Sequence, residues 1–154
     1  MAQFHVVAMG GTFDVIHDGH IALLKRAFSI SDKVIIGLTG DELAGKRGKK
    51  IKSGYSQRLG ALEQLIKTKF PGRSHVISML DDDFGPAVIE GDVEALVVSD
   101  ETAHKGDVLN RQRRERNLRP VQVVTVPMIL AGDGKRISST RIRNSEIDSK
   151  GNLL

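Results

Sequence analysis

Five short apolar runs, separated by segments with helical spacing, constrain the fold of this chain more than any other feature. The runs are Phe4–Met9, Lys33–Leu38, His75–Leu80, Ala95–Val98 and Val121–Val126. The second is apolar almost throughout, as is typical of strands that are covered on both faces. Strands that alternate with helices predict an α/β fold with a Rossmann-like, doubly wound parallel sheet of five strands.

Helices are expected between these strands and after the last one. The clearest covers Ser56–Phe70, where apolar residues recur at helical spacing. Two more are expected at about Gly19–Ser31 and at Asp107–Asn117, and a last one follows Ile137. We assign no helix or strand to the polar, glycine-broken stretch Asp41–Gly54.

Length and composition favour one domain with its own core. The chain has 154 residues, of which 40% are hydrophobic and 27% charged, as in ordinary globular domains. We therefore expect a single domain over residues 1–154, with a loose tail after about residue 149. There is no cysteine, which excludes disulfides, thiolate metal sites and a cysteine nucleophile. No apolar run approaches the roughly 20 residues that span a bilayer, so we expect no membrane partner and a cytoplasmic location.

The positive charge of the chain is concentrated in two clusters. The formal net charge is +4, five of the seven residues from Lys46 to Lys52 are basic, and so are five of the nine from Arg111 to Arg119. Such clusters can bind nucleic acid. Aromatic stacking partners are nearly absent from both, which favours solvated surfaces and no nucleic-acid partner.

Three polar segments follow strands and are predicted to meet at one edge of the sheet. They are the residues from Gly10-Gly11 onward, Ser99–Thr102 and Ser138–Thr140. Ligands bind beyond the carboxyl ends of such strands, near the point where the strand order reverses. The glycine pair lets the backbone approach a ligand, and the N-terminus of the following helix attracts phosphate. Neither G-x-G-x-x-G nor G-x-x-x-x-G-K-[ST] occurs, so other groups must hold any phosphate.

Two motifs at that edge carry side chains suited to phosphate. His17 and His20 lie three residues apart at the start of a helix and would be neighbours, although capping or surface histidines are an alternative. Metal binding fits poorly, because no third His or Cys lies nearby at ligand spacing. One hydroxyl of Ser138-Ser139-Thr140 would serve as an N-cap. Three hydroxyls followed by Arg141 and Arg143 also suit a polyphosphate.

Together these motifs resemble those of the nucleotidylyltransferase superfamily. Gly10–Asp14 precedes His17–His20, the histidine form of its H-x-G-H or T-x-G-H motif, and Ile137–Arg143 matches its I-S-S-T-x-x-R motif. The middle of the chain is similar to the archaeal-type phosphopantetheine adenylyltransferases, which resemble the adenylyltransferase domain of eukaryotic coenzyme A synthase. The shared features are Asp83-Phe84-Gly85-Pro86, Val98–Thr102, Gly106, Asn110 and Arg113.

The resemblance implies transfer of the adenylyl group of ATP to 4′-phosphopantetheine, which gives dephospho-coenzyme A and pyrophosphate. It implies that His20 and His17 contact the ATP phosphates and that His20 stabilises charge on the α-phosphate. Thr12 would orient the attacking phosphate, and Arg143 would neutralise the leaving pyrophosphate. Catalysis would come from positioning and charge stabilisation, because a phosphate is already a competent nucleophile.

A lysine of the first basic cluster is expected to bridge the two substrates, with Lys46 as first choice and Lys49 as second. Mg²⁺ is expected to accompany ATP, held mainly by its phosphates because no carboxylate cage is visible. The residues implied to bind ATP are Gly10, Gly11, Thr12, Phe13, Asp14, His17, His20, Ser99, Asp100, Glu101, Thr102, Ser138, Ser139, Thr140 and Arg143.

The sequence leaves other functional interpretations open. Nicotinamide-mononucleotide adenylyltransferases share both end motifs but use a different acceptor. Small cytidylyltransferases usually carry an R-T-x-G-I-S-T-T-like segment, which Gly132–Ile137 does not match. A non-catalytic nucleotide- or RNA-binding module would use the Arg111–Arg119 face. The protein could be a monomer or a small homo-oligomer.

Overall fold

The protein forms one five-stranded sheet in which every pairing is parallel, as the sequence predicts. The structure is a computed structural model that describes residues 2–48, 50–85, 88 and 91–154. The strand order is β3-β2-β1-β4-β5, that of a doubly wound sheet. The strands are β1 (Phe4–Gly11), β2 (Ser31–Thr39), β3 (Ser74–Leu80), β4 (Ala95–Ser99) and β5 (Gln122–Val126).

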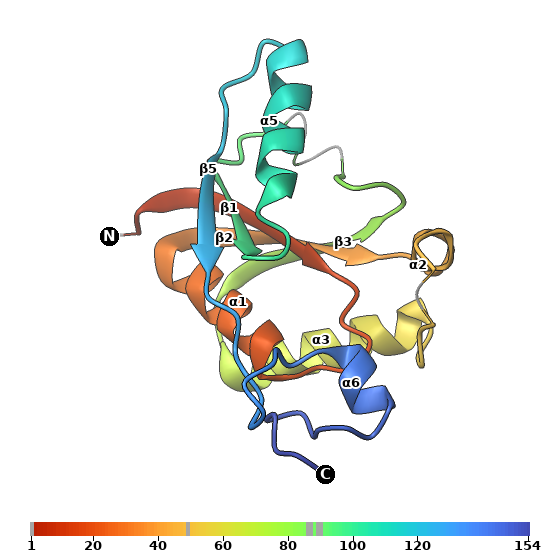
Figure 1. The fold of residues 1–154 in the computed structure, drawn as a ribbon. Helices are drawn as coiled ribbons and strands as arrows, with labels where there is room; N and C mark the ends of the chain where they lie inside the picture. The colour runs from red at the N-terminus through yellow and green to blue at the C-terminus, as the bar shows by residue number, and fades with distance from the viewer. Residues whose placement is uncertain (1, 49, 86–87, 89–90) are drawn as a thin grey trace.

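Helices cover both faces of this sheet (Figure 1). α1 and α3 lie on one face, and α5 lies on the other and projects beyond the strands. This is the arrangement expected when each crossover between parallel strands is right-handed. The helices are α1 (Asp18–Ile30), α2 (Asp41–Lys46), α3 (Tyr55–Lys69), α5 (His104–Glu115) and α6 (Ser139–Arg143).

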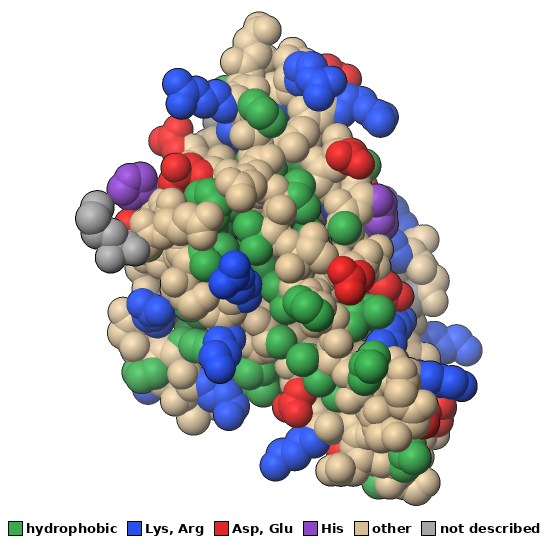
Figure 2. All heavy atoms as spheres, turned by 60° about the vertical axis from the view of Figure 1, so that its left-hand side comes forward, with side chains coloured by type: hydrophobic (Ala, Val, Ile, Leu, Met, Phe, Trp, Pro, Cys, Tyr) green, Lys and Arg blue, Asp and Glu red, His purple; other side chains and the backbone are tan. Residues whose placement is uncertain are grey.

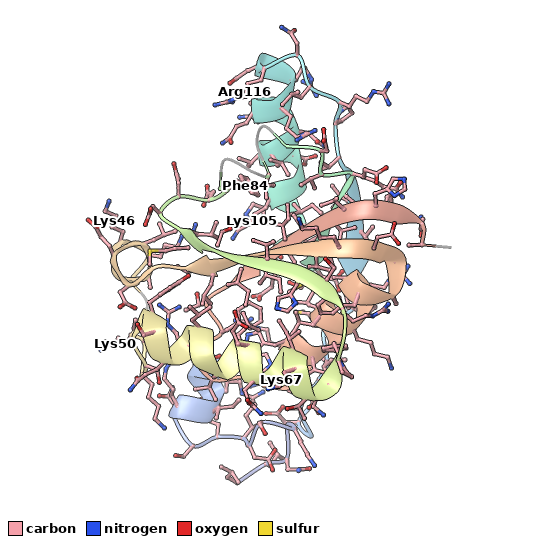
Figure 3. All side chains as sticks on the ribbon, turned by 180° about the vertical axis from the view of Figure 1, so that it is seen from behind. Lys46, Lys50, Lys67, Phe84, Lys105 and Arg116 are labelled. Carbon is pink, nitrogen blue, oxygen red and sulfur yellow. The ribbon has the colours of Figure 1, made fainter. Side chains whose placement is uncertain are left out.

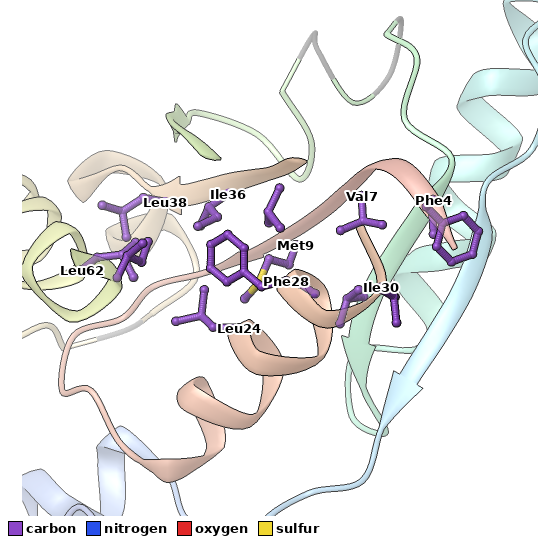
Figure 4. Packing of buried hydrophobic residues seen from close by; sticks show 14 of the residues in the cluster. Phe4, Val7, Met9, Leu24, Phe28, Ile30, Ile36, Leu38 and Leu62 are labelled. Atoms are coloured by element: carbon purple, nitrogen blue, oxygen red, sulfur yellow. The ribbon is translucent and has the colours of Figure 1, made fainter. Parts of the chain in front are cut away.

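Side chains of the central strands point alternately to the two faces of the sheet and belong to two separate hydrophobic clusters. On β1, Val7 faces the cluster under α1 and α3, whereas Ala8 faces the cluster under α5. β4 alternates in the same way. Figure 4 shows Leu24 and Phe28 of α1 and Leu62 of α3 in the first of these clusters. Burial on both faces explains why the central strands are apolar throughout.

The sheet opens at the point where its strand order reverses, between β1 and β4. β2 pairs with β1 along the whole strand, up to Gly11 opposite Leu38. The paired positions of β4 on β1 are Val7 and Ala8. Beyond Ala8, the carboxyl end of β1 therefore separates from β4 and leaves room for a ligand, as the rule for open α/β sheets requires.

One region differs from the sequence-based expectation. α2 lies in the stretch to which no helix was assigned; its first turn carries Asp41 and Glu42, which favour a helix N-terminus.

The C-terminal residues are hydrogen-bonded to the rest of the chain. Asp18 N donates to Ser149 O over 3.1 Å, and Gly132 N donates to Gly151 O over 2.8 Å.

Candidate active site

Two cavities meet at the open edge of the sheet. The larger one encloses about 660 Å³ between the β1–α1 loop, the loop after β4 and the start of α6. The smaller one encloses about 230 Å³ between the ends of β1 and β2, the segment after β3 and the start of α5. They share one wall, which we call the shared wall: Gly10, Gly11, Thr12, Leu23, Ser99 and Thr102.

The larger cavity gathers nearly all the residues that the sequence implies for ATP. Every member of that set lines it except Asp100, which is exposed in the turn after β4. Segments more than 100 residues apart in the chain are thus brought to one cavity. The polar edge predicted from the sequence lines this cavity of about 660 Å³.

The two histidines close the N-terminus of α1 as a capping box. Nδ1 of His17 accepts from the backbone N–H of Gly19 at 3.0 Å, and Nδ1 of His20 accepts from the backbone N–H of His17 at 3.2 Å. Because each Nδ1 accepts a hydrogen bond, the proton of each neutral ring lies on Nε2. A Cβ on Gly19 would lie 2.8 Å from the His17 ring, so only glycine fits between the histidines.

Burial keeps His17 neutral. It lowers the pKa of His17 from 6.5 to about 4; nearby Asp18 opposes this effect and Arg136 adds to it. The rings of His17 and His20 stack with centroids 3.9 Å apart, and Phe13 lies against His20 at 4.7 Å. The backbone of Phe13 has a positive φ of 50°, which is uncommon for an aromatic residue and marks a tightly held turn.

The chain itself occupies the first backbone donors of α1. Asp18 N donates to Ser149 O, and Gly19 N donates to His17 Nδ1. The expectation that the bare helix N-terminus attracts phosphate is therefore replaced by a more specific arrangement. The imidazole rings, rather than these N–H groups, are presented to the cavity.

The hydroxyls of the C-terminal motif have different partners. Ser138 is the N-cap of α6, and its Oγ accepts from Arg141 N at 3.2 Å, so the capping interpretation is confirmed for one serine. Ser139 Oγ donates to Val15 O over 2.9 Å and so joins the two motifs. Thr140 Oγ1 accepts from Arg143 at 3.1 Å.

An ion pair makes the second connection between the motifs. Nη1 of Arg143 donates to Oδ2 of Asp14 over 2.6 Å, and the Asp14 side chain is only 2% exposed. The same carboxylate accepts from Lys52 N at 2.9 Å and from Ser53 N at 3.0 Å. Asp14 therefore ties the basic segment before α3 to both motifs.

The loop after β4 forms the opposite side of the larger cavity. Ser99 N donates to Thr102 Oγ1 over 3.2 Å, which closes a tight turn. Glu101 pairs with Arg136, and both side chains line the cavity.

The first basic cluster, Lys46–Lys52, contributes side chains to both cavities. Lys50 lines the larger cavity and Arg47 the smaller one, whereas Lys46 is exposed on α2 and lines neither (Figure 3). Lys49, the second choice, lies outside the described residues. Arg47 is paired with Asp83 at 2.5 Å.

Lys105, at the start of α5, is a second cation in the smaller cavity. Burial lowers its pKa, Arg47 adds to this effect, and Asp83 opposes it. Figure 3 shows its position between the sheet and Phe84. The sequence motifs did not single out Arg136 or Lys105, which lie in a loop and in the first turn of α5. Arg47 belongs to the first basic cluster, from which a lysine was chosen instead.

The basic clusters do not form uniform cationic surfaces. Arg113 is buried and donates to backbone carbonyls of Arg119 and Val88. Figure 2 shows basic and acidic side chains together near the top of this face, and a separate group of basic side chains lower down. Within the described residues, no helix is both long and apolar enough to cross a membrane.

Comparison with known proteins agrees with this geometry. The cytidylyltransferase-like family matches residues 8–145. The phosphopantetheine adenylyltransferase of Methanothermobacter thermautotrophicus is 40% identical over 99% of this chain and 91% of its own length. That of Methanopyrus kandleri is 36% identical over 96% of this chain and 94% of its own length. The chain belongs to the cytidylyltransferase-like family, in the branch of the archaeal phosphopantetheine adenylyltransferases.

Members of this family are nucleotidyltransferases, and the enzyme class predicted from the sequence is thereby confirmed. A crystal structure of a protein of unknown function from Archaeoglobus fulgidus has the same fold, with a TM-score of 0.69 and 30% identity. It covers 79% of this chain and 88% of its own. Its match supports the overall fold.

Proposed function

We propose that this nucleotidyltransferase transfers the adenylyl group of ATP to the phosphate of 4′-phosphopantetheine. The observation that carries the proposal is the shared wall between two cavities of different character. A transfer between two bound substrates needs two adjoining sites whose reactive groups meet. Gly10, Gly11 and Thr12 form the floor of both cavities at the junction.

The larger cavity suits ATP. The Nε2 protons of the neutral His17 and His20 rings and the guanidinium of Arg143 are donors for a polyphosphate. The hydroxyls of Ser138 and Thr140 line the same side. We propose that His20 stabilises charge on the α-phosphate and that Arg143 neutralises the departing pyrophosphate. Glu101 and Arg136, across the cavity, border the nucleoside.

The smaller cavity suits a long, uncharged arm that ends in a phosphate. Outside the shared wall, Ile35, Met79 and Leu96 form an apolar part of its wall. Arg47 and Lys105 supply positive charge to the same cavity. A pantetheine arm would lie along the apolar wall and direct its phosphate to Thr12.

In the proposed reaction, an oxygen of the acceptor phosphate attacks the α-phosphorus of ATP. The bond from that phosphorus to the α–β bridging oxygen breaks, and this oxygen leaves with pyrophosphate. No proton abstraction is needed, because the acceptor oxygen is already anionic. Holding two reactants in line can contribute about 7–11 kcal/mol, against about 0.3–2 kcal/mol for one helix terminus.

We propose that Mg²⁺ is held by the ATP phosphates rather than by a protein cage. The carboxylates of the larger cavity already have cationic partners: Asp14 bonds Arg143 and Glu101 bonds Arg136. No group of three or more His, Cys, Asp or Glu that could hold a metal occurs in residues 2–48, 50–85, 88 and 91–154. When bound, the ion would neutralise phosphate charge.

The decisive experiment is pyrophosphate release from ATP, measured in parallel with 4′-phosphopantetheine, nicotinamide mononucleotide and glycerol 3-phosphate. We expect turnover with the first acceptor alone. Turnover with the second would reassign the acceptor while keeping the chemistry. Release with none of the three, together with salt-sensitive RNA binding, would favour a non-catalytic binding module.

A further inference from the structure

One buried cation lies directly beneath the site without lining it. Arg58 of α3 has a side chain that is 0% exposed. It continues the buried stripe of its helix, four residues before Leu62 and eight before Ile66. Neither cavity is lined by Arg58 in the part of the chain that the structure describes.

The guanidinium of Arg58 bonds four residues in three separate segments of the chain. Its Nε donates to Ser53 O over 3.0 Å. Its Nη1 donates to both Thr12 O at 2.8 Å and Thr39 O at 2.7 Å. Nη2 donates to the carboxylate of Asp41 over 2.7 Å. A planar group with several donors in fixed directions can satisfy such a set, which a lysine ammonium cannot reproduce.

Each carbonyl that Arg58 holds belongs to a segment that shapes the active site. Thr12 lies in the shared wall and precedes Phe13, whose φ is positive. Thr39 ends β2, and its own hydroxyl donates to Gly11 O over 3.2 Å. Arg58 thus fixes the β1 turn both directly, through Thr12, and indirectly, through Thr39.

The third carbonyl, that of Ser53, connects Arg58 to Arg143, which is proposed to bind phosphate. The backbone N–H of Ser53 holds the carboxylate of Asp14, and Asp14 holds Arg143. The path from Arg58 to Arg143 consists of hydrogen bonds between buried or half-buried groups. Such groups transmit a displacement because close-packed interiors do not deform freely.

Stability alone is a weak reason to bury this charge. Removing an ion from water costs several kcal/mol, and apolar side chains of similar volume often serve the fold equally well. Asp41, the counter-ion of Arg58, is itself 54% exposed. The three backbone carbonyls are more informative, because they are the ends of segments that must be held in register for catalysis.

We propose that Arg58 is a positioning residue that fixes the shared wall and, through Asp14, the orientation of Arg143. It sets the rate of adenylyl transfer without touching either substrate. This inference rests on the proposed function, because it concerns the alignment of the two substrates in that reaction.

The test compares two buried arginines. Arg113 of α5 is also buried, and it donates to the carbonyls of Arg119, Val88 and Gly91 under the opposite end of the sheet. Arg58→Lys and Arg113→Lys therefore remove the same kind of bonding at two places. Unfolding by denaturant, kcat with saturating substrates and the Kd for ATP are measured for both. Val88 lines the smaller cavity, so the KM of the acceptor is left out of the comparison.

We expect both variants to lose stability but only Arg58→Lys to lose turnover. A displacement of reacting groups by about 1 Å can cost about 100-fold in rate, so kcat of Arg58→Lys should fall roughly 10- to 100-fold. Its Kd for ATP should change by less than about threefold, or roughly 0.6 kcal/mol. Arg113→Lys should keep kcat within about twofold of wild type. A folded Arg58→Lys protein with wild-type kcat would overturn the proposal, as would an equal loss in Arg113→Lys.

A second variant decides the matter if Arg58→Lys does not fold. Asp41→Asn removes the counter-charge of Arg58 but leaves the buried side chain in place. Charge-assisted bonds are about twice as strong as neutral ones, so a kcat lowered by roughly threefold or more is expected. Unchanged kcat in Asp41→Asn would then reject the positioning role. A wild-type protein that releases no pyrophosphate would contradict the proposed function, whereas an active wild type with an equally active Arg58→Lys contradicts this inference alone.

Discussion

Arg143 and Asp14 lie 129 positions apart, and the guanidinium of one donates to the carboxylate of the other over 2.6 Å. This bond joins the C-terminal motif to the turn that follows the first strand. Asp14 was expected to be an ATP-binding residue. In the structure it is a buried acceptor for Arg143 and for two backbone N–H groups. Its charge orients a cation toward the cavity, so its effect on ATP would pass through Arg143.

Removing the charge of Asp14 should therefore affect both stability and nucleotide binding. We expect Asp14→Asn to lower the free energy of unfolding by about 2–4 kcal/mol, because Asp14 is a buried carboxylate that pairs with Arg143 and accepts two backbone N–H groups. The KM for ATP should rise as well. Denaturant unfolding and steady-state kinetics measure the two effects.

Asp133→Asn is the matched control for this prediction. Asp133 pairs with Arg141, but its side chain is 29% exposed and the pair does not join the two motifs. Removing the charge of Asp133 should lower the free energy of unfolding much less than removing that of Asp14. A double-mutant cycle between Asp14→Asn and Arg143→Met should give a coupling of about 1 kcal/mol or more. Strict additivity would show that the pair does not act as a unit.

His20 combines catalysis with capping, and two substitutions separate these roles. His20→Ala removes both, whereas His20→Gln retains a side-chain oxygen that can complete the capping box from the third helical position. We expect both to lower kcat by roughly 100-fold or more, the loss seen for one transition-state donor. Only His20→Ala should also lose about 1 kcal/mol of stability. Near-normal turnover in His20→Gln would remove the imidazole from the reaction centre.

The lowered pKa of His17 makes stability depend on pH in acid. The unfolded chain takes up a proton on His17 near pH 6.5, whereas the folded protein does so only near pH 4. Between these values the unfolded state binds more protons, so stability falls as the pH falls, and above about pH 7 the effect disappears.

His17→Asn tests this linkage. Asparagine is a good N-cap and does not titrate. Wild type should therefore lose on the order of 1–3 kcal/mol more than His17→Asn between about pH 7 and pH 4. Denaturant unfolding at several pH values gives this difference directly, and carboxylates common to both proteins cancel from it. Parallel stability curves would mean that His17 is not held neutral by the fold.

The apolar pattern of the chain was sufficient to predict the sheet, but not all that holds it together. Val7 and Ala8 belong to clusters on opposite faces of the sheet. A strand that is buried on both faces needs apolar residues at every position, and this continuous apolar run is visible in the sequence. α2 left a weaker trace: it is six residues long, and only Leu43 and Ala44 are buried. The attachment of the C-terminal residues depends on long-range backbone bonds, which leave no trace in local sequence.

In the site, residues within short motifs were predictable, and residues recruited from elsewhere were not. His17, Ser138 and Arg143 belong to motifs whose spacing is fixed by helix geometry. Arg58 looks like an ordinary charge on an amphipathic helix. Its position one turn before Leu62 and two turns before Ile66, on the same face of the helix, was a usable signal. An arginine on an apolar stripe has to find carbonyl or carboxylate partners inside the fold.

The choice of lysine in the basic segment can now be tested with the geometry in view. The sequence favoured Lys46, whereas in the structure Lys50 lines the larger cavity. We expect Lys50→Ala to raise the KM for ATP about fivefold, which corresponds to about 1 kcal/mol of phosphate interaction. Lys46→Ala should change it by less than about twofold, as expected for an exposed charge away from the ligand. Lys67→Ala, on the exposed face of α3 (Figure 3), controls for the loss of one positive charge from the protein as a whole. A larger effect of Lys46→Ala would mean that α2 moves toward the substrates when they bind, and the original assignment of the bridging lysine would then stand.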